Sequence, residues 1–220
     1  EQYFELKNTK ITGSPRFDSF QNKKSKSVKP EREQVGINCN FSYGLYADVA
    51  KQWVMDIVET TDSLSVKHQI SQHIGDVTDL SKFNLYHNGI YDMINESTVF
   101  VSRFSTAIIE ALLLGCPVIY YNPHKEMQPT FLDAIGGFPT PTTKSELKDA
   151  LQDILENPEK WLSSAEKFLD FHVAFKDGNS AKVFAKELIE IAKKKTTLDS
   201  YFPIRSHVKY IIELITRKFK

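Results

Sequence analysis

Cysteine is scarce in this sequence, and its scarcity excludes one class of protein. Only Cys39 and Cys116 occur among 220 residues. Domains held together by disulfide frameworks carry many more cysteines, so this chain must rely on an apolar core. Both cysteines stand in apolar, strand-like surroundings, where a buried and reduced thiol is the expected state. Neither belongs to a catalytic cysteine–histidine pattern, so we expect no nucleophilic cysteine and a reducing, cytoplasmic compartment.

Net charge and long apolar runs are also missing. The 28 Lys and Arg residues balance 28 Asp and Glu residues, whereas nucleic-acid binders carry a basic excess, so no nucleic-acid partner is expected. No apolar run approaches the roughly 18 residues of a membrane span, and no signal peptide is recognisable. A chain that begins at Glu1 rather than Met is expected to be a piece of a longer protein. With 41% hydrophobic residues, it has enough apolar material for one large domain or two small ones.

The charges are balanced in sum but not along the chain. Residues 1–35 carry eight basic and five acidic residues, and residues 181–220 carry ten and four. The body between them carries ten basic and nineteen acidic residues. The basic ends fit either ordinary solvated helix faces or contact with an anionic membrane surface or a further domain.

Changes in composition divide the chain into three parts. The composition of residues 1–33 predicts a lead-in segment that ends in a flexible polar linker over 19–33. Residues 34–195 hold the apolar periodicity of a folded domain. Residues 196–220 are expected to form a C-terminal amphipathic helix, with its helical spacing over 208–218.

Within the folded part, strand-like and helix-like segments alternate from residue 35 to about 142. The expected strands cover 35–40, 64–67, 83–86, 98–102 and 117–121, and the expected helices cover 46–60, 90–95 and 105–114, with further helices over 146–155, 161–171 and 181–195. Such alternation predicts an α/β fold, a Rossmann-like doubly wound parallel sheet with a helical tail. Ligands of such sheets bind at the carboxyl ends of the strands.

The segment 98–123 carries the richest chemistry. A strand leads into a loop with Ser102 and Arg103, and a helix begins at Ser105 and Thr106. Hydroxyl groups and free backbone N–H groups at such a position attract an anion. Glu110 shares a helix face with Thr106, where a carboxylate could accept hydrogen bonds from sugar hydroxyls. Alternatively, Ser105 is only a helix cap and Glu110 a surface charge.

This pattern resembles a known family. Ser-Thr-x-x-x-Glu-Ala-x-x-x-Gly-x-Pro-Val-Ile, from Ser105 to Ile119, resembles the nucleotide-sugar half of GT-B glycosyltransferases that build bacterial surface and capsular polysaccharide. That group includes transferases of Kdo and sialic acid from CMP-sugars, and CDP-glycerol glycerophosphotransferases and UDP-sugar 2-epimerases share the domain type. The segment Gly13–Asp18 and the late segment Phe171–Ala181 are similar to corresponding segments of these proteins.

Other candidate binding residues follow expected strands. Lys67 and His68 stand at the end of the expected strand 64–67, where the resemblance places a histidine near the phosphate or base of the donor. His87 and Asn88 lie in the loop after the expected strand 83–86, where the resemblance implies contact with the nucleotide base. Either pair could instead be a solvated loop or turn. No spacing of Cys, His and Asp indicates a metal site, and no cofactor is expected.

The resemblance implies a glycosyltransferase part that binds a nucleotide-sugar, with a CMP-sugar such as CMP-Kdo or CMP-sialic acid as the expected donor. It implies that an N-terminal acceptor-binding domain holds most of the catalytic machinery, so no catalytic residue is assigned. The acceptor would be a cell-surface polysaccharide or glycolipid, with the enzyme in the cytoplasm or at the inner face of the cell membrane. The alternatives are a CDP-glycerol-type glycerophosphotransferase, a UDP-sugar epimerase, and a non-catalytic interaction domain.

Overall fold

The fold is built around one parallel sheet. The structure, a computed structural model, describes residues 9–21, 34–126, 134–174 and 176–193. In these ranges four strands pair in the order β2-β1-β3-β4, all parallel. They are β1 (Gln34–Cys39), β2 (Lys67–Gln72), β3 (Val99–Ser102) and β4 (Val118–Tyr120). The alternation in the sequence therefore predicted the sheet type correctly.

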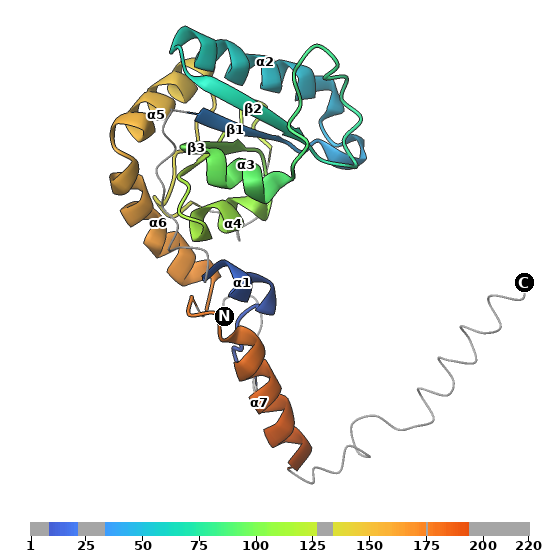
Figure 1. Cartoon of the computed structure of the whole chain (residues 1–220), viewed down its shortest axis with the longest axis vertical. Coiled ribbons are helices and arrows are strands. Elements are labelled where there is room, and N and C mark those ends of the chain that lie inside the picture. The colour runs from blue at the N-terminus through green and yellow to red at the C-terminus, as the bar shows by residue number, and fades with distance from the viewer. Residues whose placement is uncertain (1–8, 22–33, 127–133, 175, 194–220) are drawn as a thin grey trace, which may run out of the picture.

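Helices cover both faces of the sheet (Figure 1). Helices α2 (Ala47–Ser63) and α5 (Lys144–Glu156) pack on one face, and α3 (Ile90–Glu96) and α4 (Ala107–Leu113) pack on the other. Alternate residues of β3 enter the two layers, because Val99 and Val101 join the α2 side and Phe100 joins the α4 side. Burial on both faces explains why β3 and β4 are mainly apolar.

Gly36, in β1, allows the turn between α3 and β3 to pack closely against the sheet. A β-carbon at this position would lie 2.5 Å from Ser97 Oγ, in the turn between α3 and β3. Any larger residue would therefore force the Ser97 side chain to move. Gly115, with φ of +80°, lies two residues after the end of α4, in a left-handed conformation that favours glycine.

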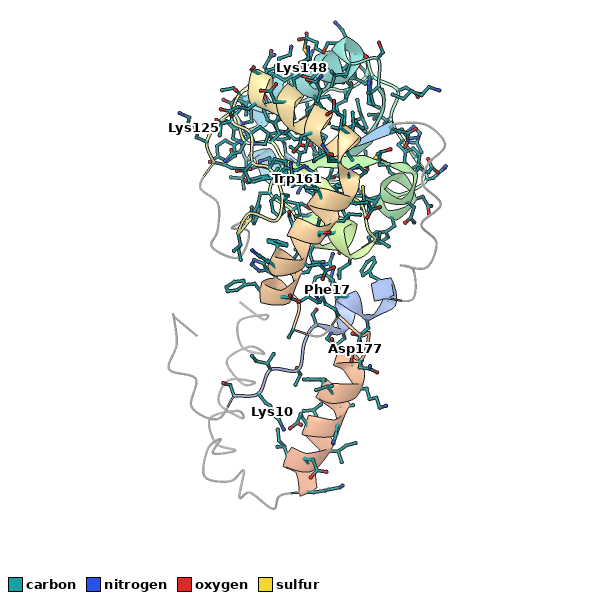
Figure 2. The ribbon with its side chains drawn as sticks, turned by 90° about the vertical axis from the view of Figure 1, so that its left-hand side faces the viewer. Lys10, Phe17, Lys125, Lys148, Trp161 and Asp177 are labelled. Carbon is teal, nitrogen blue, oxygen red and sulfur yellow. The ribbon has the colours of Figure 1, made fainter. Side chains whose placement is uncertain are left out.

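The lead-in segment connects the sheet domain to the last described helix. A short 3₁₀ turn, η1 (Pro15–Phe17), continues into α1 (Asp18–Gln21). The carboxylate of Asp18 accepts hydrogen bonds from the backbone N–H groups of Ser180 (3.0 Å) and Ala181 (2.7 Å). These are the first residues of α7 (Ser180–Lys193), so Asp18 caps that helix. Figure 2 shows Phe17 and Asp177 at this junction, between the sheet domain and α7.

Helix α7 projects from the body of the protein (Figure 1). It follows α6 (Pro158–His172), which packs on the α4 side through Ala165, Phe168 and Leu169. Apart from Ser180, the residues of α7 are exposed or half-buried. In the ranges given above, no helix is both long and apolar enough to span a bilayer.

Several expected boundaries were wrong. The strand expected over 64–67 in fact begins at Lys67, because β2 pairs in register with β1 from Gln34↔Lys67 onward. The strand expected over 83–86 is reduced to one isolated bridge between Leu85 and Ile70. The linker expected over 19–33 starts too early, since Phe20 is only 4% exposed and belongs to the core. The rest of that linker, residues 22–33, and the expected helix over 196–220 lie outside the described residues.

Candidate functional site

The order of the strands defines where a ligand is expected. The chain passes from β1 to β2 on one side and then crosses to β3 on the other side of β1. The carboxyl ends of β1 and β3 therefore flank a topological switch point, the usual ligand position in open α/β sheets. The segments that meet there are residues 40–46 after β1, residues 73–78 after β2 and residues 103–106 after β3.

Buried hydrogen bonds join the two strands at the switch point. Asn38 Nδ2 donates to Ser102 Oγ at 3.0 Å, and Ser102 Oγ donates to the carbonyl of Arg103 at 2.7 Å. Asn40 Nδ2 donates to the carbonyl of Phe104 at 3.3 Å. Ser102 is fully buried, so its hydroxyl connects the two strands inside the protein and does not face a ligand.

Arg103 links three loops at this edge. Its Nε and Nη2 atoms lie 2.8 and 2.7 Å from Glu126 Oε2, and its Nη1 atom donates to the carbonyl of Asn40 at 2.8 Å. Tyr120 donates its hydroxyl to the second oxygen of Glu126 at 2.8 Å. Both charged side chains are at least nine-tenths buried. Arg103 was predicted to bind the nucleotide-sugar, but these contacts direct its guanidinium into the protein.

The residues predicted after β3 do lie at the switch point. Thr106 is exposed and Ser105 is half-buried, and Ser105 Oγ accepts a hydrogen bond from the backbone N–H of Ala107 at 3.2 Å. Ser105 thus binds the first N–H group of α4 from the position before Thr106, which is the N-cap residue of that helix. Glu110 is 2% exposed, and its Oε1 atom is bound by Arg16 Nη2 at 2.6 Å and Nε at 2.9 Å. The lead-in motif Gly13–Asp18 thus contacts the motif that begins at Ser105.

His73 is a site residue that the sequence reasoning missed. It follows β2 directly and is exposed at the carboxyl edge. Its Nδ1 atom lies 2.6 Å from Ser42 Oγ and accepts a hydrogen bond from the Gly75 N–H at 3.1 Å. In a neutral imidazole this arrangement leaves the proton on Nε2. The signal that could have found His73 was the strand end, which was placed five residues too early.

Asp76 supports the same loops from inside. Its carboxylate accepts hydrogen bonds from the Phe41 N–H at 2.8 Å, from Cys39 Sγ at 3.2 Å and from the hydroxyl of Thr78 at 2.6 Å. Burial opposes its ionisation, but the hydrogen bonds from Thr78 and Phe41 hold the pKa of Asp76 below its usual value. Burial, followed by the nearby Asp76, raises the pKa of the Cys39 thiol. Cys39 and Cys116 are both free and buried, as expected.

Lys67 and His68 lie at the opposite edge of the sheet. They begin β2, so they sit at its amino end rather than beside Ser105 and Thr106. A hollow of about 580 Å³ lies at this amino edge and is lined by both residues, with Asp62 among its other walls. His68 Nδ1 lies 3.0 Å from Thr61 Oγ1. The expected position of these residues at the carboxyl end of a strand is therefore wrong, and ligand binding by them stays a prediction.

His87 and Asn88 are exposed in the loop that leads to α3. Gly89, with φ of +101°, forms the entry to that helix. Tyr91, in the first turn of α3, lies close to Glu110 and Arg16, and its pKa is raised by burial and then by the Glu110 charge. Base contact by His87 and Asn88 stays a prediction.

His124 is a second histidine that the sequence reasoning did not select. It follows β4, its side chain is 8% exposed, and both ring nitrogens are buried without a hydrogen-bond partner in the described structure. Its ring lies 4.7 Å from the ring of Tyr46, and its Nε2 atom is 3.6 Å from Glu126 Oε2. Burial, with a smaller repulsion from Arg103, lowers the pKa of His124, although Glu126 and Asp48 oppose the shift.

This pKa shift predicts acid sensitivity. Unfolded chains protonate histidine near pH 6.5, whereas folded His124 stays neutral to a lower pH, so the unfolded state binds more protons in that window. Stability is therefore fully present above pH 6.5 and is lost as the pH falls toward the folded pKa. We expect urea unfolding at pH 8 and pH 5.5 to show a smaller loss for His124→Phe than for the unmodified chain. The exposed-site variant His87→Gln should keep the original loss, and an unchanged loss in His124→Phe would contradict the assignment.

Comparisons with known proteins confirm the fold. A scan against models of protein families finds no match. A solved structure of the wall teichoic acid polymerase TagF has a TM-score of 0.53 at 11% identity and covers 82% of this chain and 51% of its own. The UDP-GlcNAc 2-epimerase of Neisseria meningitidis, bound to UDP-GlcNAc, also has a TM-score of 0.53, at 16% identity, over 82% of this chain and 54% of its own. The fold is that of a GT-B-type, Rossmann-like domain.

One curated protein also shares sequence with the chain. The teichoic acid ribitol-phosphate polymerase TarK of Staphylococcus aureus (strain NCTC 8325 / PS 47) is 27% identical over 127 residues. The match covers 57% of this chain and 23% of the polymerase, so the chain spans less than a quarter of that relative. The narrower resemblance to transferases that use CMP-Kdo or CMP-sialic acid stays a prediction.

Proposed function

We propose that this chain binds the nucleotide of an activated donor for a transferase that builds a cell-surface polymer. The observation that carries the proposal is the polar carboxyl edge at the switch point of a GT-B-type sheet. There, Ser42 Oγ contacts both His73 Nδ1 and Asn40 Oδ1, and Asn40 in turn binds the carbonyl of Phe104, directly before Ser105 and Thr106. Parallel α/β sheets bind their ligands at this position.

The comparisons favour a cytidine diphosphate donor over a CMP-sugar. TarK is by name a ribitol-phosphate polymerase, and a TagF structure that resembles this chain was soaked with CDPG. We therefore propose transfer of an alditol phosphate from a CDP-linked donor as the first candidate reaction. Sugar transfer from a CMP-sugar, such as CMP-Kdo or CMP-sialic acid, is the second, supported by the motif from Ser105 to Ile119.

Each exposed polar group at the edge has a role in this proposal. His73 is exposed and its Nδ1 atom accepts the Gly75 N–H, so in the neutral ring Nε2 carries the proton and can donate to a phosphate oxygen. The hydroxyl of Thr106 is exposed and can donate to a phosphate oxygen. None of these groups is assigned a catalytic role, because the acceptor and its domain are themselves only proposed. Peripheral membrane contact through the basic ends also stays a proposal.

Thermal-shift titration with CMP, CDP, UDP and GDP tests the proposal. A nucleotide that binds only the folded chain stabilises it by mass action, by about 2.7 kcal/mol at a concentration 100 times its Kd. We expect CDP to give the largest rise in melting temperature. A response to CMP alone would shift the reaction to sugar transfer, and a preference for UDP would shift it to the epimerase class. No response to any of the four would overturn nucleotide binding and leave a non-catalytic interaction domain.

A variant localises the binding. Thr106→Ala removes an exposed hydroxyl that makes no helix cap, so it should weaken CDP binding several-fold and leave the melting temperature of the free chain unchanged. The control Ser145→Ala removes an exposed hydroxyl from α5, on the other face of the sheet, and should bind CDP normally. Equal affinities in the two variants would place the nucleotide elsewhere.

A further inference from the structure

Arg16 occupies an unusual position for a residue of a lead-in segment. It lies on η1, 94 residues from Glu110 in the sequence, yet its Nε and Nη2 atoms both contact Glu110 Oε1, at 2.9 and 2.6 Å. The Glu110 side chain is only 3% exposed, whereas the Arg16 side chain is 58% exposed. One edge of the guanidinium is therefore fixed by a buried carboxylate while much of the group remains accessible to solvent.

The helix that carries Glu110 gives no structural reason for a carboxylate. The other residues of α4 are apolar and buried. A buried charge is costly without a partner, and an apolar pair of similar volume would join two segments at least as well as an ion pair. What an ion pair adds is a permanent positive charge held in one orientation at the surface.

The surroundings of Arg16 restrict its movement. Phe20, four residues later, is 4% exposed in the core, and Asp18 caps α7 with both of its carboxylate oxygens. Arg16 Nη2 also lies 3.5 Å from the exposed Thr106 hydroxyl. The guanidinium is thus held beside the first turn of α4, next to residues of the proposed nucleotide site.

We infer that Arg16 binds a phosphate group of the donor and that Glu110 is a positioning residue for it. The guanidinium is planar and always charged, and its N–H groups match the oxygen atoms of a phosphate. This inference rests on the proposed function. It also changes the expected role of Glu110, because Arg16 already occupies Oε1 of this buried carboxylate.

The test compares ligands with and without phosphate. Calorimetric titration of the chain with CDP and with cytidine should show that Arg16→Gln raises the Kd for CDP about tenfold or more and leaves cytidine binding unchanged. Arg16→Lys keeps the positive charge but loses the planar guanidinium. Its Kd for CDP should therefore lie between that of the unmodified chain and that of Arg16→Gln. Lys10→Gln is the charge-matched control, since Lys10 pairs with Glu187 on α7 away from the site (Figure 2).

Glu110→Gln separates positioning from direct contact. If Glu110 orients Arg16, this variant weakens CDP binding but spares cytidine. Equal weakening of both ligands would show that Glu110 contacts the ribose and would overturn its positioning role. Melting temperatures of all variants confirm that each is folded.

Two failures remain distinguishable. If the unmodified chain binds CDP and Arg16→Gln binds it equally well, the inference on Arg16 is wrong and the proposed function stands. If the unmodified chain binds none of CMP, CDP, UDP and GDP, both are wrong.

Discussion

Replacing Glu126 with Ala is expected to lower the free energy of unfolding by about 3–5 kcal/mol, the cost of leaving a buried charge without its partner. Glu126 and Arg103 are each less than a tenth exposed, and Glu126 also accepts the hydroxyl of Tyr120. Arg103 in turn holds the Asn40 carbonyl, so the loss should loosen the loops after β1 and β3 together. Urea denaturation of the variant, followed by circular dichroism, measures the loss.

Two further variants decide whether the unpaired charge is the cause. The double variant Arg103→Met with Glu126→Leu removes both charges and keeps the volume, so it should recover most of the lost stability. Glu190→Ala breaks an exposed pair with Lys193 on α7 and should cost about 0.5 kcal/mol or less. A loss below about 1 kcal/mol in Glu126→Ala would show that water replaces the carboxylate and would contradict the expected burial.

Replacing Trp53 with Ala is expected to cost about 3–5 kcal/mol, the range found for large aromatic residues in cores. Trp53 is 1% exposed, packs edge-on against Phe41 at 5.6 Å between ring centroids, and donates its indole N–H to the Tyr121 carbonyl at 2.9 Å. It therefore joins α2 to the ends of β1 and β4. Guanidinium denaturation measures the loss, and Trp53→Phe should lose only part of it because the ring is largely kept.

Trp161 is the matched control. It is partly buried on α6, where Figure 2 labels it. It donates its N–H to Asp153 at 2.9 Å, and the Lys160 ammonium lies 5.1 Å from the centroid of its ring. Because more of its surface stays in water, Trp161→Ala should cost well under half as much as Trp53→Ala. Similar losses for the two variants would contradict the distinction between a core indole and a peripheral one.

Much of the fold could be predicted from local pattern. The segments 98–102 and 117–121 each hold a short run of β-branched and aromatic residues, and they became β3 (Val99–Ser102) and β4 (Val118–Tyr120). The helix expected over 46–60 became α2 (Ala47–Ser63), because its apolar residues recur at helical spacing. Prediction failed at β2, whose sequence Lys67–Gln72 is mostly polar, since an edge strand with half-exposed faces carries little periodicity.

The candidate site was also predictable only in part. Ser105 and Thr106 could be placed at the switch point, because a strand followed by hydroxyl residues and a helix is a local signal. Without knowing that β2 ends at Gln72, one could not predict that His73, and not His68, lies at the carboxyl end of the strand. The role of Arg103 was also hidden, because its partners Asn40 and Glu126 are brought to it only by the sheet.

Local sequence pattern was enough to predict the alternation of strands and helices, the parallel sheet, the buried cysteines and the importance of the segment from Ser105 to Ile119. These depend on the order and spacing of apolar residues, which act over a few turns of chain. The tertiary structure alone decided that Arg16 binds Glu110, that Asp18 caps α7, and that Lys67 and His68 lie at the amino edge. Such contacts join residues far apart along the chain, and only the packed sheet fixes the distances between them.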